Sequence, residues 1–204
     1  MERSEILEMM ATLQLTGMRA AYDEIVSVGI KRQHGLEKII GALLAAEIAA
    51  KNARSINYQT TIAKLPLVKE LAGLSFDGTP INGALIEQLS SGAFLADQRN
   101  VVLVGGTGTG KTHLAIGITR SIIRLGKKAR FFNVVDLVNR LEGEVKQGRQ
   151  GRIADRLSRV DLLILDELGY LPFAQSGGQL LFHLISKLYE RTALNTSRSS
   201  KRSE

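Results

Sequence analysis

One feature limits the fold of this chain more than any other, namely an apolar run that leads straight into a glycine-rich loop. Residues 101–104 read Val-Val-Leu-Val, which is typical of a buried parallel strand. The residues that follow fit the pattern G-x-x-x-x-G-K-[ST], and they are Gly105, Gly106, Thr107, Gly108, Thr109, Gly110, Lys111 and Thr112. Glycines let a backbone wrap closely around phosphate oxygens, so that its N–H groups and the start of the next helix face the anion. The order of strand, loop and helix predicts a nucleotide-binding loop rather than a flexible Gly/Thr turn.

A second apolar run ends in two adjacent acids. Residues 162–165 are Leu-Leu-Ile-Leu, and Asp166 and Glu167 come directly after them. Together with the glycine-rich loop, this pattern predicts that Lys111 contacts the β- and γ-phosphates of ATP and that Thr112 and Asp166 hold Mg²⁺. Glu167 is then expected to orient and polarise the attacking water, so Glu167 and Lys111 are the predicted catalytic residues. A solvated helix cap would explain the acidic pair alone.

Apolar spacing predicts two kinds of structure in the two halves of the chain. The first 55 residues carry apolar side chains at helical intervals, the widest stripe being Leu36, Ile39, Ile40, Leu43, Leu44 and Ile48. From residue 100, strands expected at 101–104, 129–132 and 162–165 alternate with helices expected at 111–124, 136–145 and around 180–188. This alternation predicts an α/β domain with a parallel sheet, preceded by a small all-α domain. The expected boundaries are 1–72 for the helical domain, 73–96 for a linker with a short helix near 83–90, and 97–192 for the nucleotide-binding core.

Charge and composition narrow the range of partners. The chain has a net charge of +7, and residues 97–204 hold 18 basic and 10 acidic side chains. This bias favours a polyanionic partner, and the basic side chains between Arg140 and Arg159 are the candidate contacts to a DNA backbone, with a subunit interface or a solvated surface as the alternatives. The chain has no cysteine and only three scattered histidines, which excludes thiolate chemistry and argues against a His-based metal site. Without a membrane-length apolar run or a secretory start, we expect a cytoplasmic protein.

The two motifs and the stretches around them resemble the IstB family, helper ATPases of insertion-sequence transposition that are related to the DnaC helicase loaders. The resemblance is carried by the loop 105–112, by the run Asp166-Glu167-Leu168-Gly169-Tyr170-Leu171-Pro172 and by residues 180–191, and it extends from about residue 5 to Thr192. It implies a P-loop ATPase of the AAA+ class, with Lys111, Thr112, Asp166 and Glu167 at its nucleotide site. It also implies ATP-dependent homo-oligomers on double-stranded DNA and a partner transposase of the IstA type.

The last residues depart from that family pattern. Residues 193–204 contain only two apolar side chains, so we expect them to form a disordered Ser-rich basic tail. The pattern of the AAA+ class leads us to expect a truncated or frame-shifted chain whose sheet lacks a central strand, and whose sensor and arginine finger have no candidates. Two alternatives to a transposition helper therefore stay open: a replicative helicase loader of the DnaC type, and a nucleotide-binding remnant that hydrolyses nothing.

Overall fold

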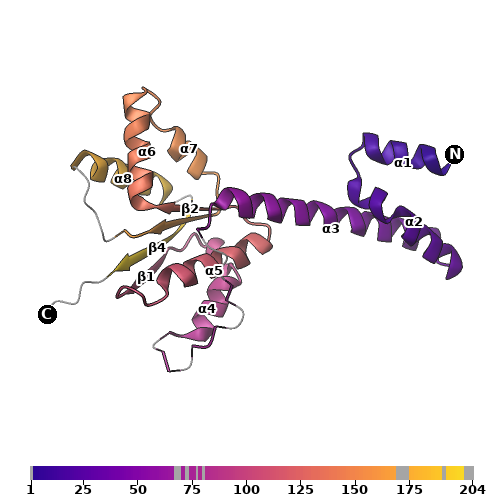
Figure 1. Cartoon of the computed structure of the whole chain (residues 1–204), viewed down its shortest axis with the longest axis horizontal. Coiled ribbons are helices and arrows are strands. Elements are labelled where there is room, and N and C mark those ends of the chain that lie inside the picture. Colours follow the sequence, from indigo (N-terminus) through magenta and orange to yellow (C-terminus); the bar gives the residue numbers. More distant parts are fainter. Residues whose placement is uncertain are drawn as a thin grey trace. The chain divides into compact units, whose positions relative to one another are not determined.

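The computed structural model describes residues 2–66, 70–71, 74–76, 78–79, 81–168, 175–189 and 192–199. The chain divides into two compact units, Met1–Tyr58 and Gln59–Glu204, and each is described by itself. Figure 1 shows the helices of the first unit and the sheet of the second. Within the described ranges, no helix combines the length and the apolar character that crossing a bilayer requires.

The first unit is helical, as the apolar spacing predicted. It contains α1 (Arg3–Thr12), α2 (Thr16–Lys31) and most of α3 (Leu36–Ala63). Glu2 and Glu5 form a capping box at the start of α1, in which the Glu2 N–H donates to Glu5 Oε2 over 2.7 Å.

The start of α2 is capped by an acid from another helix. No side chain of its own caps α2, but Glu47 Oε2 of α3 accepts hydrogen bonds from the N–H groups of Gly17 and Met18 at 2.6 and 3.0 Å. A carboxylate at this position satisfies free N–H groups and complements the positive end of the helix dipole. The two helices cross closely at Gly17, where a Cβ atom would lie 2.6 Å from the Cβ of Ala50. This crossing therefore requires glycine.

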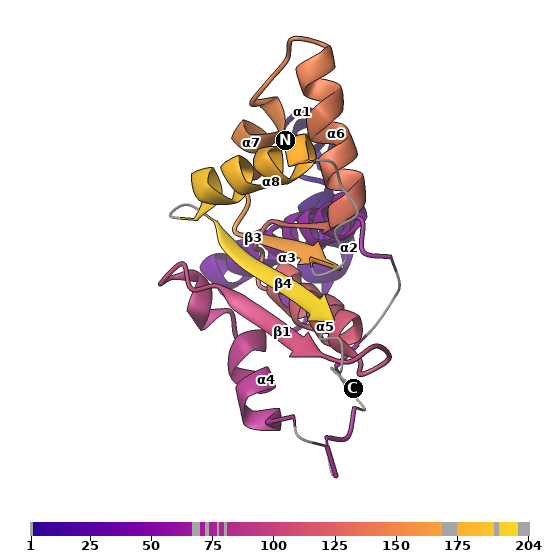
Figure 2. The ribbon, with the colours of Figure 1, turned by 90° about the vertical axis from the view of Figure 1, so that its left-hand side faces the viewer.

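The second unit is built on a four-stranded parallel sheet (Figure 2). Its strands are β1 (Val101–Gly105), β2 (Ala129–Asn133), β3 (Leu162–Asp166) and β4 (Ala193–Ser199), in the order β1-β4-β3-β2. The expected strands at 101–104, 129–132 and 162–165 are thus confirmed. Every residue of β3 is buried, which explains its continuous apolar sequence.

Helices cover both faces of the sheet. Figure 1 shows α5 (Lys111–Arg124) on one side, and α6 (Val134–Lys146), α7 (Arg152–Leu157) and α8 (Gln175–Leu188) on the other. A core of buried leucines and valines joins α6, α7 and α8 to β3 and β4. The short helix expected near 83–90 is α4 (Gly83–Ser90), which packs against α5, and a 3₁₀ turn, η1 (Ala93–Leu95), follows it. This layered arrangement is the predicted α/β fold.

The expected disorder from residue 193 onward is wrong for residues 193–199. These residues form β4, which fills the centre of the sheet between β1 and β3, so the expectation of a missing central strand is wrong as well. A strand in this position forms backbone hydrogen bonds on both edges, and this compensates for its few apolar side chains. Asn100 Oδ1 also accepts a hydrogen bond of 2.9 Å from the N–H of Leu194. Residues 200–204 of the expected tail lie outside the described residues.

Candidate nucleotide site

The glycine-rich loop connects β1 to α5 at the carboxyl edge of the sheet. β1 ends at Gly105 and α5 begins at Lys111, with Gly110 as its N-cap residue. Gly108 and Gly110 have φ angles of +75° and +83°, which residues with a side chain adopt only with strain. Thr109 closes the turn by donating from its hydroxyl to the Gly106 carbonyl at 2.9 Å, and Thr107 is exposed on the loop. The loop conformation therefore depends on its glycines.

The side chain of Lys111 folds back over this loop. Its Nζ donates to the carbonyl oxygens of Gly106 and Gly105 at 2.6 and 3.0 Å, and lies 3.3 Å from Thr109 Oγ1. A positive charge is thus placed among backbone groups at the start of a helix, where an anion is also favoured by the helix dipole.

Two residues far apart in sequence meet beside the loop. Thr112 Oγ1 lies 3.0 Å from Asp166 Oδ2 and 3.3 Å from its Oδ1, across 54 residues of sequence. Thr112 is on the first turn of α5, and Asp166 is the buried last residue of β3. A hydroxyl and a carboxylate side by side are oxygen ligands of the kind that Mg²⁺ takes. No group of three or more His, Asp or Glu side chains within the described ranges could hold a metal ion by itself, and a Mg²⁺ ion bound here would complete its coordination with water or phosphate oxygens.

Glu167 adopts an unusual backbone conformation and contacts the neighbouring strand. Its φ angle is +66°, a region that costs a residue with a side chain about 1 kcal/mol or more and that is often found at functional sites. Its Oε2 accepts a hydrogen bond of 2.6 Å from Asn133 Nδ2, at the end of β2. The Asn133 Oδ1 in turn accepts from the N–H of Val135 and caps α6. Asn133 thus ties the second acid to the next strand.

Sequence reasoning missed Asn133 and also the segment at residues 70–71. Asn133 is a polar residue at the end of an expected strand, and that position was the available signal. Leu71 packs directly against Gly117 of α5. A Cβ atom on Gly117 would lie 2.6 Å from the side chain of Leu71. Glu70 accepts hydrogen bonds from Arg120 and Arg124 at 2.8 and 2.7 Å. The hydrogen bond from Arg124 is the largest influence on the pKa of Glu70, and with Arg120 it holds that pKa below its usual value in spite of partial burial.

The predicted DNA-contacting stretch is exposed. It runs from α6 through the loop at 147–151 into α7, and its exposed basic side chains are Arg140, Lys146, Arg149, Arg152, Arg156 and Arg159. Arg140 lies over the ring of Phe132 at 5.5 Å. Because salt bridges within the described ranges do not involve these six side chains, their charge is available to a polyanion.

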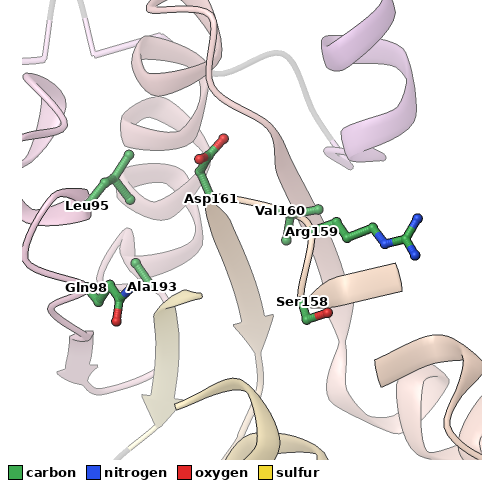
Figure 3. A pocket seen from close by; sticks show the side chains of 7 residues that line it. All are labelled: Leu95, Gln98, Ser158, Arg159, Val160, Asp161 and Ala193. Carbon is green, nitrogen blue, oxygen red and sulfur yellow. The ribbon is translucent and has the colours of Figure 1, made fainter. Parts of the chain in front are cut away.

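A polar cavity of about 260 Å³ lies at the opposite edge of the sheet (Figure 3). Its walls include Val160 and Asp161 just before β3, and Ala193 at the start of β4, together with Leu95, Gln98, Ser158 and Arg159. Arg159 of the predicted DNA-contacting stretch lines it, but none of the predicted nucleotide-site residues does. The predicted nucleotide loop lies at the other ends of these strands.

Comparison with known families gives a match over nearly the whole chain. The sequence profile of a family described as IstB-like ATP binding protein matches residues 8–200.

Individual relatives come from insertion sequences. The chain is 34% identical over 153 residues to the insertion sequence IS5376 ATP-binding protein of Geobacillus stearothermophilus. These aligned residues are 74% of this chain and 61% of that relative. It is 27% identical over 191 residues to the insertion sequence IS21 ATP-binding protein of Pseudomonas aeruginosa, covering 93% and 72% respectively. The chain thus spans about three-fifths to three-quarters of the length of these relatives.

Solved structures share the fold. The crystal structure of the DnaC helicase loader superposes with a TM-score of 0.54 at 24% identity, over 66% of this chain and 79% of that one. A DNA replication initiation factor gives a TM-score of 0.55 at 20% identity, over 66% and 42%. At these identities the likeness supports the parallel-sheet ATPase fold and nothing further.

Proposed function

Because this chain belongs to the IstB-like ATP-binding protein family, we propose that it is the ATP-dependent helper of an insertion sequence, acting on duplex DNA with a partner transposase. The observation that carries the ATP-dependent part of the proposal is the 3.0 Å contact between Thr112 Oγ1 and Asp166 Oδ2. It joins the end of the phosphate loop to the end of β3, as a shared magnesium–triphosphate site requires.

The residues of the loop fit a triphosphate. The N–H groups of the loop and of the first turn of α5 would bind phosphate oxygens, and the glycines leave room for close approach. Lys111 would exchange the carbonyls of Gly105 and Gly106, its partners at 3.0 and 2.6 Å, for the more negative oxygens of the β- and γ-phosphates. Thr112 and Asp166 would hold Mg²⁺, which neutralises charge on the phosphates.

Glu167 is the proposed residue for hydrolysis. A carboxylate one residue beyond the metal-binding acid can accept a proton from the attacking water. The hydrogen bond from Asn133, 2.6 Å long, fixes the direction of this carboxylate. Glu167→Gln should therefore reduce phosphate release by at least about 100-fold while leaving nucleotide binding intact.

The basic stretch from Arg140 to Arg159 is the proposed DNA-binding surface. Its six exposed cations can bind the phosphates of duplex DNA without reading the sequence. The related proteins named above belong to insertion sequences, which supports a transposase as the protein partner. The proposed working form on DNA is a homo-oligomer.

Nucleotide binding is the first test. A fluorescent ATP analogue should bind the purified chain saturably and in a Mg²⁺-dependent manner, and Lys111→Ala or Asp166→Asn should weaken that binding by at least about tenfold. Lys127→Ala removes an exposed lysine outside the loop and should bind like the unmodified chain. A folded chain that shows no saturable binding would overturn the proposal.

The partner is tested separately. The immobilised chain should retain the transposase encoded by the same element in the presence of ATP and duplex DNA, and should not retain the replicative helicase. Retention of the helicase alone would assign the chain to the loaders instead. Absence of phosphate release from the unmodified chain, with ATP binding intact, would identify a remnant that binds nucleotide only.

A further inference from the structure

Helix α5, which begins at the end of the phosphate loop, carries a stripe of four residues along one side. The stripe consists of His113, Gly117, Arg120 and Arg124. Their spacing of four, three and four residues places them on one face of the helix. The opposite face carries the buried side chains of Ile118 and Ile122, and α5 packs with its buried residues against β1 and β4. The stripe therefore lies on the side of α5 that the sheet does not cover.

Glu70, from the stretch between α3 and α4, contacts this stripe toward both of its ends. Its carboxylate accepts hydrogen bonds from Arg120 at 2.8 Å and from Arg124 at 2.7 Å. The Arg120 side chain is only 19% exposed, so its charge is partly shielded from solvent. Near the start of the helix, His113 Nε2 lies 3.3 Å from the Glu70 carbonyl oxygen. His113 directly follows Thr112, so this contact reaches the residue next to a proposed magnesium ligand.

Leu71 covers the middle of the stripe. A Cβ atom on Gly117 would lie 2.6 Å from the side chain of Leu71 and 3.5 Å from its backbone nitrogen. Glycine weakens the interior of a helix relative to alanine, and the close approach of Leu71 explains why α5 has glycine at this point. Residues 70–71 are called the strap below.

We propose that the strap holds α5 in the position that binds nucleotide, with Glu70 as its positioning residue. This inference rests on the proposed nucleotide site. The sheet contacts one face of α5 and the strap contacts the other, so the strap limits movement of the helix that begins at Lys111. Because coupling between two sites is reciprocal, nucleotide must in turn hold the strap more firmly against α5. A strap that served packing alone would not respond to nucleotide.

Charge reversal tests the contribution of Glu70. Glu70→Arg should weaken binding of the fluorescent ATP analogue by at least about fivefold, because it repels the two arginines of the stripe. The double variant Glu70→Arg/Arg120→Glu restores a pair of opposite charges and should recover most of that affinity. Glu87→Arg makes the same change at an exposed position of α4 and should bind like the unmodified chain. Circular dichroism checks that each variant keeps its helices.

A glycine substitution tests the contact of Leu71. Gly117→Ala should also weaken binding of the ATP analogue by about fivefold, because the added methyl group displaces the strap even though alanine favours the helix. Gly143→Ala is the matched control on α6, where a Cβ atom meets nothing within 4 Å. This control should bind the analogue like the unmodified chain.

Thiol labelling measures the strap itself. The chain contains no cysteine, so Leu71→Cys introduces a single thiol whose reaction with a maleimide reports how often the strap leaves α5. ATP with Mg²⁺ should slow this reaction by at least about fivefold, but not when Lys111→Ala is added. Adding Glu70→Gln should accelerate the reaction without nucleotide. Leu85→Cys, at a position of α4 that is 49% exposed, should react rapidly with or without ATP.

These measurements separate the strap from the nucleotide site. If the unmodified chain binds no ATP analogue, the proposed function fails and the positioning role with it, while the labelling rates without nucleotide still show whether Glu70 holds the strap. The positioning role alone is overturned if the unmodified chain binds the analogue but ATP leaves the labelling of Leu71→Cys unchanged. It is also overturned if Glu70→Arg and Gly117→Ala bind the analogue normally, or if the double charge variant does not recover affinity.

Discussion

Gly17 lies at the crossing of α2 and α3, where there is no space for a side chain. A Cβ atom would come within 2.6 Å of Ala50 Cβ and 2.7 Å of the Ala46 carbonyl oxygen. We expect Gly17→Ala to destabilise the helical unit by about 1–3 kcal/mol, because the helices must separate. Gly41→Ala, on α3 with open space around it, should instead stabilise by about 0.5–1 kcal/mol, the usual gain for alanine in a helix. Urea unfolding followed by circular dichroism compares the two, and equal effects would contradict the close crossing.

Glu47 couples the stability of the same unit to pH. Burial acts to raise its pKa, but the hydrogen bonds from the N–H groups of Met18 and Gly17, with the charges of Lys51 and Arg54, hold that pKa below its ordinary value near 4.5. Its contribution is therefore fully present above pH 4.5 and is lost as the pH falls through the lower pKa of the folded chain.

The pH dependence can be measured on variants that lack the charge. Urea midpoints recorded between about pH 7 and pH 3 should fall less steeply for Glu47→Gln than for the unmodified chain. Asp23→Asn is the control, because the pKa of Asp23 is also lowered, by the hydrogen bond from Arg3, but this pair is exposed and contributes little. If Asp23→Asn flattens the pH dependence of the urea midpoint as much as Glu47→Gln does, the buried Glu47 carboxylate contributes no more to stability than an exposed ion pair.

At the scale of elements, β4 carries a polar side chain that the sheet does not satisfy. Asn195 is fully buried, and neither its Oδ1 nor its Nδ2 has a hydrogen-bond partner among the residues that the structure describes. Asn195→Val removes two unsatisfied groups and should raise the free energy of unfolding by about 1–3 kcal/mol. Leu194→Asn places an amide at the neighbouring buried position and should lower the free energy of unfolding by a similar or larger amount. Thermal unfolding with and without ATP measures both, and a destabilised Asn195→Val would show that the amide has a partner.

The comparison of β4 with the other strands shows which parts of the fold can be predicted from sequence. β1 and β3 each contain an apolar run of four residues, 101–104 and 162–165, and this local pattern was sufficient to predict both strands. Residues 193–199 lack that pattern, because their stability comes from two neighbouring strands whose residues lie far away in sequence. In the same way, the phosphate loop and Asp166 follow from spacing, whereas Asn133 and Glu47 have roles that depend on tertiary contacts. A cap donated by another helix leaves no local signal.

At the scale of the whole molecule, the uneven distribution of charge predicts how DNA binding responds to salt. The second half holds 18 basic and 10 acidic side chains, and the proposed surface lies within it. Replacing Arg149, Arg152 and Arg156 by Gln should reduce the slope of log K against log salt by about 2–3, close to one for each lost phosphate contact. Replacing Arg19, Lys31 and Arg32 in the first half by Gln is the matched control, and it should leave the slope of log K against log salt unaltered. Fluorescence anisotropy with labelled duplex DNA provides the measurement, and equal slopes would place the DNA elsewhere.

The strand order has a consequence for how the protein is made. Among the described residues, β1 joins the sheet through β4 alone, although β1 comes first of the four in the chain and β4 comes last. A nascent polypeptide on the ribosome can pair β2 with β3, but it cannot unite β1 with them until β4 has emerged and entered between them. Competence to bind nucleotide should therefore be acquired late and abruptly during synthesis, by insertion of a single segment.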